Sequence, residues 1–501
     1  MSAETIDSRR ACAARFLVAP AALVLLATSG TALGQALVRV PADQPTLQAA
    51  INAVPDGGVI EMAAGTYLSP AGGFAINDRG KAFTIRAAAG ATVNLDGGGT
   101  RDIIRFINST VGAGRPVEFE NLVFRNGLSS TAGIAGGVTL QRAKATFKGC
   151  RFENNRVTST STGGGGVEVA ISSEAFFLDC TWSGNAAYIY GGGLAVETSS
   201  RAWIHRGLFQ NNRTNLPNHH PFSAGGGIHV GDSSLRVSNS RFEGNQAGYV
   251  GGALYAIGSW TDPVATPRSD VVVSNSTFVD NRSVRDASVP SAGQPPTEGG
   301  AVHFEDQTTA RVFTSRFVTN RADTGGAMSL YRALVTAKGC VFQGNRAVGS
   351  GAGNGFGGSI SAVSNDAPDA TTGFGTINRR TSSLTVIDSV IQGRYGAVTT
   401  VAQTGGGLYV AGDGNSLYGR NGMPQSGTAA QNRASLQLTN VAIYDCEVVG
   451  GPSNDPGTGV GGGLEVDLAD MSSTGLLVGK GAAGLATGLG AGGGVVGIGQ
   501  S

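Results

Sequence analysis

Residues 325–347, GGAMSLYRALVTAKGCVFQGNRA, contain the pattern that most of the chain repeats. Two glycines open the segment, an apolar-x-apolar triplet follows, and a second short apolar run leads to an aromatic residue and then to Asn-Arg. The glycine-led triplet returns as AGGVTL at 135, GGGVEV at 164, GGGLAV at 191, GGGIHV at 225, GGALYA at 251, GGAVHF at 299, GGSISA at 357, GGGLYV at 405 and GGGLEV at 461. A repeat of roughly 25 to 50 residues is typical of a solenoid or an array.

The apolar residues within each unit alternate with polar ones, as in Ile228/Val230 and Leu235/Val237, and show no helical spacing. Each unit is therefore predicted to be a coil of two or three short strands. Such a coil cannot bury an apolar face alone, so successive coils must stack strand over strand, about 4.8 Å apart. The sequence thus predicts an all-β chain folded as a single-stranded parallel β-helix.

Two further columns support this stacking. The motif aromatic-x-x-Asn recurs seven times, and its Asn is expected to form an internal ladder of side-chain amides and to tolerate a left-handed turn. The motif occurs at Phe152/Asn155, Trp182/Asn185, Phe209/Asn212, Phe242/Asn245, Phe278/Asn281, Phe317/Asn320 and Phe342/Asn345. Two residues before each aromatic residue lies a small one, and Cys150, Cys180 and Cys340 occupy this column where other coils have Ser or Gly. We therefore expect these cysteines to be packed free thiols.

Composition agrees with a turn-rich solenoid and excludes some partners. Glycine supplies 80 of the 501 residues, about 16% against a usual share of about 7%, without a Gly-x-y period. The formal net charge is +1, which provides no general attraction to nucleic acid or to a membrane surface. No segment after the N-terminal one approaches 18 uninterrupted apolar residues, so no transmembrane helix is expected.

The chain is predicted to be exported and to divide into four parts. Residues 1–34 resemble a signal peptide, because Arg9, Arg10 and Arg15 precede the short apolar stretch 16–27 and small residues follow. The remaining parts are a cap with the first coils (35–134), the repeat region (135–466) and a glycine-rich end (467–501), which is either a frayed coil or a truncated one. Within the cap, TLQAAINAV at 46–54 follows Asp43 and predicts a short helix that covers the open end of the solenoid. An exported chain is expected outside the cell or at the outer membrane of a bacterium.

The linked GGA/GGG triplet and Phe-x-x-Asn motifs resemble the repeats of the chlamydial polymorphic outer membrane proteins. The opening ADQPTLQAAINAVPDGGVIEMAAGTY is similar to the N-terminal cap of bacterial β-helix proteins of the pectin-lyase-like class. These resemblances imply a right-handed parallel β-helix outside the cell, with adhesion as its role. The chain departs from the first family because it lacks the alternating strands of a C-terminal translocator barrel.

Enzymes of the pectin-lyase-like class combine carboxylate clusters, calcium and a basic residue, or use paired Asp residues. The sequence contains no Asp-Asp pair, no Gly-His-Gly and no dense carboxylate cluster on neighbouring coils, so no catalytic residue is assigned. A polysaccharide lyase or glycoside hydrolase remains the alternative function, and calcium is expected only in that case. The histidines lack metal-ligand spacing, so no metal site and no cofactor are predicted.

The ligand site is predicted around residues 214–305. The middle residue of each triplet should point away from the solenoid, so His229, Tyr255 and His303 should lie side by side, with Glu305 on the same face. The insertions at 214–224, 258–270 and 284–298 would form walls beside this floor, and Trp260 lies in one of them. An open groove with aromatic faces and hydrogen-bonding groups suits a sugar chain. Solvated decoration with no ligand is an equally good interpretation.

A second candidate site follows the Asn ladder. The next residue is arginine in five of the seven coils, and Arg282, Arg321 and Arg346 occupy three successive ones. Such a stripe suits the carboxylate, sulfate or phosphate groups of a polymer. The alternative is that each arginine pairs with a neighbour such as Glu153 or Asp280. The sequence as a whole predicts a monomeric binding or adhesion module whose partner is a polysaccharide or a cell-surface glycan.

Overall fold

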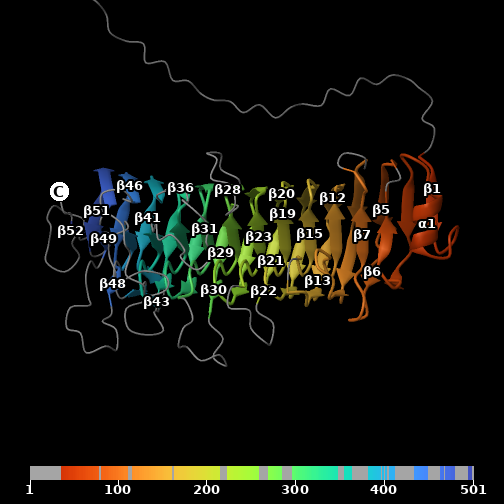
Figure 1. Ribbon diagram of the computed structural model, residues 1–501, viewed down its shortest axis with the longest axis horizontal. Coiled ribbons are helices and arrows are strands. Elements are labelled where there is room, and N and C mark those ends of the chain that lie inside the picture. The colour runs from red at the N-terminus through yellow and green to blue at the C-terminus, as the bar shows by residue number, and fades with distance from the viewer. Residues whose placement is uncertain are drawn as a thin grey trace, which may run out of the picture. The chain divides into compact units, whose positions relative to one another are not determined.

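The computed structural model confirms the predicted parallel β-helix (Figure 1). It describes residues 35–77, 80–110, 115–160, 163–214, 223–258, 269–284, 296–347, 355–363, 382–395, 398–399, 401–402, 406–411, 434–448, 463–467, 469–479 and 495–498. The expected signal peptide lies outside these residues, as do most of the inserted loops. Among the described residues, no helix has the length and apolar character needed to cross a bilayer.

Four parallel sheets run along the stack, and each complete coil contributes one strand to each of them in the order sheet 1, sheet 2, sheet 3, sheet 4. Sheet 1 consists of β1 (Leu37–Val40), β2 (Val59–Met62), β5 (Phe83–Ala87), β8 (Val117–Glu120), β12 (Lys144–Lys148), β16 (Glu174–Leu178), β20 (Arg201–His205), β24 (Ser234–Ser238), β28 (Ser269–Ser274), β32 (Thr308–Phe313), β36 (Leu334–Lys338), β40 (Ser383–Ile387), β46 (Ala434–Thr439) and β50 (Ala469–Thr474). Sheet 2 consists of β3 (Gly65–Leu68), β6 (Val93–Asp96), β9 (Leu122–Arg125), β13 (Arg151–Glu153), β17 (Thr181–Ser183), β21 (Leu208–Gln210), β25 (Arg241–Glu243), β29 (Thr277–Val279), β33 (Arg316–Val318), β37 (Val341–Gln343), β41 (Val390–Gln392), β47 (Ala442–Tyr444) and β51 (Leu477–Gly479).

Sheet 3 is built from two-residue strands that follow the Asn ladder, and sheet 4 contains the glycine-led triplets. Sheet 3 consists of β10 (Leu128–Ser129), β14 (Arg156–Val157), β18 (Ala186–Ala187), β22 (Arg213–Thr214), β26 (Gln246–Ala247), β30 (Arg282–Ser283), β34 (Arg321–Ala322), β38 (Arg346–Ala347), β44 (Val401–Ala402) and β48 (Glu447–Val448). Sheet 4 consists of β4 (Phe74–Ile76), β7 (Ile104–Ile107), β11 (Val138–Gln141), β15 (Val167–Ala170), β19 (Leu194–Glu197), β23 (Ile228–Gly231), β27 (Leu254–Ile257), β31 (Val302–Glu305), β35 (Met328–Tyr331), β39 (Ile360–Val363), β45 (Leu408–Ala411), β49 (Leu464–Asp467) and β52 (Val495–Ile498). A small antiparallel pair, β42 (Arg394–Tyr395) and β43 (Val398–Thr399), lies outside these sheets.

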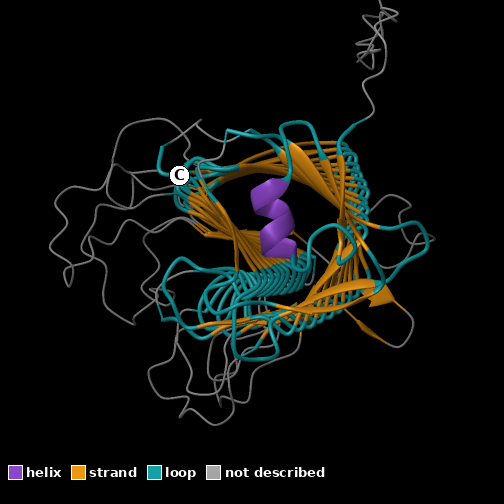
Figure 2. Ribbon diagram, turned by 90° about the vertical axis from the view of Figure 1, so that its right-hand side faces the viewer, coloured by secondary structure: helices purple, strands orange, loops and turns teal. Residues whose placement is uncertain are grey.

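The helix α1 (Leu47–Ala53) closes the N-terminal end of the stack, as predicted. It lies across the opening of the coils in the view along their axis (Figure 2). Thr46 caps the helix by accepting a hydrogen bond from the Ala49 amide at 3.1 Å. Leu47, Ala50 and Ile51 are buried, so the helix seals the apolar interior of the first coils.

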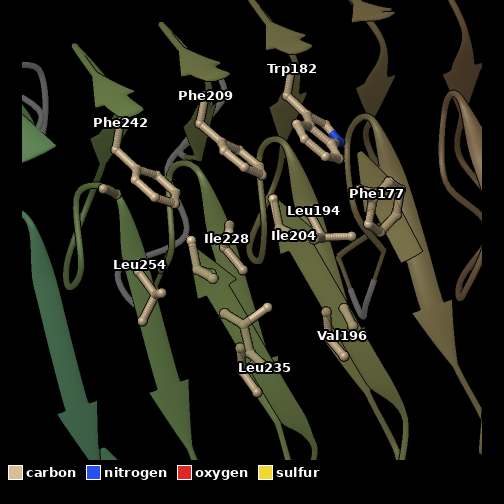
Figure 3. Close-up of a cluster of buried hydrophobic side chains, with 14 of the residues drawn as sticks. Phe177, Trp182, Leu194, Val196, Ile204, Phe209, Ile228, Leu235, Phe242 and Leu254 are labelled. Atoms are coloured by element: carbon tan, nitrogen blue, oxygen red, sulfur yellow. The ribbon is translucent and has the colours of Figure 1, made fainter. Parts of the chain in front are cut away.

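The interior combines a stack of aromatic rings with the predicted Asn ladder. Trp182, Phe209 and Phe242 lie in a row on neighbouring strands of sheet 2 (Figure 3), with ring centroids 4.2 and 4.8 Å apart. Each ladder Asn is fully buried, and its Nδ2 donates to a main-chain carbonyl of the preceding coil and, in all but the last member Asn345, also to the Oδ1 of the next Asn. The left-handed conformation belongs to the residue before each ladder Asn, such as Asn154 or Asp280, and not to the ladder Asn as expected.

The small-residue column also forms a ladder at the corner between sheets 1 and 2. Where the next residue of the column is a serine, its hydroxyl accepts from the main-chain amide of the residue before it, as in Ser240 to Ser276 at 3.1 Å. Cys150, Cys180 and Cys340 are buried in this column and are free, as is Cys446. Burial raises the pKa of the Cys340 thiol to about 11, which agrees with a packing role.

Candidate functional site

The triplets of three successive coils bring the predicted ligand-binding residues together. In sheet 4, His229 of β23 pairs in register with Tyr255 of β27, and Tyr255 pairs with His303 of β31. Their ring centroids are 5.3 and 5.7 Å apart. The prediction that these three strands are neighbours is confirmed.

The expectation of an open floor is wrong, because the described residues just before six successive triplets lie across the outer face of sheet 4. These segments pair in a ladder that runs through Tyr190, Ala224, Val250, Glu298, Thr324 and Phe356. Tyr249 and Val250 of this cover pack against Tyr255. As a result the exposed fraction is 4% for His229, 6% for Tyr255, 0% for His303 and 2% for Glu305. The alternation of the strand does point these side chains away from the main core, but into a second buried layer.

Glu305 organises a buried hydrogen-bond network in this layer. Its Oε2 accepts from the Tyr255 hydroxyl at 2.9 Å and lies 3.3 Å from Nε2 of His303. The other ring nitrogen of His303 lies 3.6 Å from Glu298, which also accepts a hydrogen bond from Ser329 at 3.0 Å. The cover and sheet 4 are thus joined by polar contacts as well as apolar ones. A role of these side chains in ligand binding stays a prediction.

Two further carboxyl groups extend the layer toward the N-terminal coils. Burial, together with the neighbouring Glu197, raises the pKa of Glu168 to about 8, and burial raises the pKa of Glu197 to about 7. His229 lies 3.5 Å from Glu197, and burial lowers the pKa of its ring to about 3. At neutral pH this histidine is therefore uncharged, and its contact with Glu197 is not an ion pair. Gly231 lies close to the Nε2 edge of this imidazole, since a Cβ there would be 3.1 Å from His229 Nε2.

The layer has acid and base groups but no feature of a metal centre. Among the described residues, no group of three His, Cys, Asp or Glu side chains converges so as to hold a metal ion. Trp260 and the central parts of the three predicted walls lie outside the described residues. These side chains therefore form a buried polar layer between sheet 4 and the cover. A surface that a ligand could reach must be sought on another sheet.

The arginine column provides such an open surface on sheet 3. Arg282 pairs in register with Arg321, and Arg321 pairs with Arg346, so the three residues occupy neighbouring strands. All three are exposed. In the part of the chain that the structure describes, none of them has an ion-pair or hydrogen-bond partner for its side chain.

The neighbours that were expected to neutralise this column are engaged elsewhere. Glu153 pairs with Arg151 at 3.4 Å, within strand β13. Asp280 accepts a hydrogen bond from the Thr319 hydroxyl. The alternative in which each arginine is neutralised by these acids is therefore wrong. Arg213 and Gln246 occupy the same position on the two preceding strands of sheet 3, so the column of polar side chains continues toward the N-terminal coils.

Sequence reasoning missed a pair of aromatic side chains on the outer face of sheet 1. Phe176 and Trp203 pair in register, and their rings are stacked with centroids 4.3 Å apart. If the sheet 1 segments, which directly precede the small-residue column, are aligned in the sequence, Phe176 and Trp203 fall at the same position. Other coils place Thr146, Arg236 or Arg311 at the same position.

Comparisons with known proteins agree with the β-helix fold. They give only weak information about activity. A family model described as the right handed beta helix region matches residues 81–263. Among solved structures, the pectate lyase Pel9A is similar with 12% sequence identity over 88% of this chain and 78% of the other, at a TM-score of 0.26. The PL6 family alginate lyase AlyGC is similar with 10% identity over 93% of this chain and 98% of the other, at a TM-score of 0.19. A search of curated proteins finds no match. These values are too low to transfer an activity or the role of a residue.

Proposed function

We propose that this chain is an exported right-handed β-helix that binds an anionic polysaccharide through the arginine column of sheet 3. The observation that carries the proposal is the stacking of Arg282, Arg321 and Arg346, exposed and without a side-chain partner among the described residues. The polymer would be a uronate-containing or sulfated glycan, and adhesion to a surface coated with it would be the biological role.

The electrostatics of the column favour a bound anion. Neighbouring strands are about 4.8 Å apart. Two unit charges at this separation repel each other by roughly 0.9 kcal/mol even in bulk water. The guanidinium groups can spread to reduce this energy, but a polymer that carries a carboxylate or sulfate on successive sugars would convert the repulsion into attraction. The planar guanidinium fork also matches such groups in a bidentate way.

Two features of the sequence support export and adhesion. The basic and apolar segments within residues 1–34 have the arrangement of a signal peptide. The linked GGA/GGG and Phe-x-x-Asn motifs resemble those of the chlamydial polymorphic outer membrane proteins, whose usual role is adhesion. Because the β-helix fold serves binders as well as enzymes, the proposal rests on the column and not on the fold.

The test is a binding titration of the purified protein with polygalacturonate, alginate and heparin at several salt concentrations. Wild-type affinity should fall steeply as salt rises, because exposed charge pairs are screened. The variant R282Q/R321Q/R346Q should bind about 10 to 100 times more weakly at low salt, if each arginine contributes roughly 0.5 to 1 kcal/mol.

A matched control separates the column from net charge. The variant R151Q/R206Q/R241Q also removes three positive charges, but each of these arginines is paired, with Glu153, Asp179 and Glu243 respectively. It should bind the polymers nearly as tightly as the wild type. Equal affinity of the wild type and the column variant for all three polymers would refute the proposal. Release of unsaturated products or new reducing ends by the wild type, with or without calcium, would instead favour the enzyme alternative.

A further inference from the structure

Phe176 and Trp203 form an exposed aromatic stack on the outer face of sheet 1. Their neighbours along the strands, such as Ala175 and Ile204, are buried in the core, so the two rings point outward. The ring planes are only 5° from parallel, and Phe176 is 43% exposed. The feature is therefore a flat apolar surface held in contact with water.

The repeat does not require aromatic residues at this position. The other coils from β5 to β50 place polar or aliphatic side chains there, namely Thr84, Glu118, Thr146, Arg236, Val272, Arg311, Thr336, Thr385, Gln437 and Ser472. A cross-strand aromatic pair does stabilise a sheet. The interior already provides a continuous aromatic stack, however, so an exposed pair in two adjacent coils needs another explanation.

The orientation of the rings leaves one aromatic face open. Their centroid separation of 4.3 Å is close to the strand spacing of about 4.8 Å, so the rings stack along the axis of the coils. The outer face of Phe176 therefore points toward strand β12. The residue that pairs with Phe176 on that strand is Thr146, whose small side chain cannot cover a ring. One more flat ring can continue the stack at this place.

The polar groups around the open face are charge-compensated. Lys144 lies 3.3 Å from Glu174, which also lies 4.0 Å from Arg201. Lys148 lies 2.8 Å from Glu118 and 3.2 Å from Glu120. These pairs provide hydrogen-bond donors and acceptors without an unpaired charge. The surroundings thus favour a neutral ligand with hydroxyl groups.

A protein partner fits this surface poorly. A stable interface needs about 800 Å² on each partner. The large exposed apolar side chains of the described residues are Leu68, Phe176, Leu334 and Leu477, which lie on different coils. The apolar part of this surface therefore consists of the rings of Phe176 and Trp203 alone. Its area suits a sugar ring and is too small for a stable interface with a protein.

We propose that this stack is a second glycan site, at which a pyranose ring of a neutral polysaccharide packs on the face of Phe176 above Thr146. The apolar C–H face of the sugar would lie against the aromatic ring, and its hydroxyl edge would reach Lys144 and Lys148. The site is on sheet 1, whereas the arginine column is on sheet 3, so it goes beyond the function proposed above. Its affinity does not depend on a net charge and is insensitive to salt, unlike that of the column.

The experiment is a calorimetric titration with a panel of neutral hexasaccharides: cellohexaose, xylohexaose, mannohexaose, chitohexaose and laminarihexaose. At least one should bind, with little change between low and high salt. Phe176→Leu, which keeps apolar bulk without a flat face, should weaken binding by about tenfold or more, whereas Phe176→Tyr should retain it. Trp203→Ala should also weaken binding, because it removes the support of the Phe176 ring.

Two controls separate recognition from stability. Leu334→Ala removes another exposed apolar side chain from sheet 1, on the distant strand β36, and should leave binding unchanged. Thermal unfolding of each variant shows whether it folds, and a Phe176→Leu variant that melts as the wild type does but binds weakly excludes a purely structural role. Absence of binding for the whole panel, or equal binding by the wild type and Phe176→Leu, would overturn the proposal without affecting that for the arginine column.

Discussion

The side chain of Asn281 takes part in four hydrogen bonds within the core. Its Nδ2 donates to the Phe242 carbonyl and to Oδ1 of Asn320, each at 3.0 Å. Its Oδ1 accepts from both the main-chain amide and Nδ2 of Asn245. A buried amide with all its groups satisfied fixes the spacing between three coils at once.

Replacing Asn281 by Leu should lower the free energy of unfolding by at least about 1 to 3 kcal/mol, because its partners on both sides lose hydrogen bonds while they stay buried. The measurement is thermal or denaturant unfolding of the variant beside the wild type. Asn94→Leu provides the control, since Asn94 lies on the outer side of strand β6. A change at a surface position should stay within about 0.5 kcal/mol. Equal melting temperatures for Asn281→Leu and wild type would contradict the stabilising role of the ladder.

The Asn ladder was predictable from sequence because an aromatic residue and an Asn recur three positions apart in coil after coil. The sequence pattern predicts the left-handed turn at the ladder Asn, whereas positive φ angles occur one position earlier, at residues of varied type such as Asn154, Gly184 and Thr319. A third ladder was not predicted at all. It joins Ser173, Ser200 and Ser233 at the corner between sheets 4 and 1. Serine is common throughout this chain, so a serine that recurs once in each coil does not stand out from the other serines in the sequence.

Among the elements, the strands of sheet 4 show what the alternation of apolar and polar residues can predict and what it cannot. Alternation along a strand correctly places His229, Tyr255 and His303 on one outer face, but it contains no information on what covers that face. The cover is made by the segments between sheets 3 and 4, which pair with one another through isolated bridges and not through regular strands. The arginine column was predictable because its position follows the Asn directly. Its lack of partners depends on where Glu153 and Asp280 point, which required the structure.

The buried carboxyl groups beneath the cover should make stability depend on pH. Glu168 and Glu197 keep their protons in the folded state up to a pKa of about 8 and about 7, whereas the ordinary value is 4.5. Between 4.5 and these values the unfolded chain holds fewer protons, so stability should fall as pH rises. His229, with its pKa lowered from 6.5 to about 3, acts in the opposite direction, but only below about 6.5.

The clearest window therefore lies between pH 6.5 and 8. There the slope should approach about 1.4 kcal/mol per pH unit for each carboxyl group that is protonated only in the folded state. Unfolding measurements at several pH values in this window should show a shallower slope for Glu168→Gln than for the wild type. Glu243→Gln is the control, since Glu243 lies on sheet 2 in a surface ion pair with Arg241. An identical slope for the wild type and Glu168→Gln would show that Glu168 does not hold this proton.

At the scale of the whole molecule, the order of strands in every sheet follows the chain, so each coil contacts the coil before it and the coil after it. The stability of such a solenoid is approximately a sum of coil terms and nearest-neighbour terms. The main-chain hydrogen bonds between paired strands, the corner ladders and the aromatic stack all contribute to the nearest-neighbour terms in this molecule. A local defect should therefore weaken the adjacent coils first and leave distant ones unchanged.

Hydrogen exchange on Asn281→Leu tests this behaviour. Amides in strands β25, β29 and β33, which belong to the coils of Asn245, Asn281 and Asn320, should exchange faster than in the wild type, because their ladder contacts are lost. Amides in β5 and β6, several coils away under the helical cap, should exchange at the wild-type rate and serve as the internal control. Exchange that accelerates equally along the whole chain would mean that the stack opens as one cooperative unit. In that case the interactions between coils would be far stronger than the stability of any single coil, and a mutation at one ladder position would destabilise both proposed glycan sites equally.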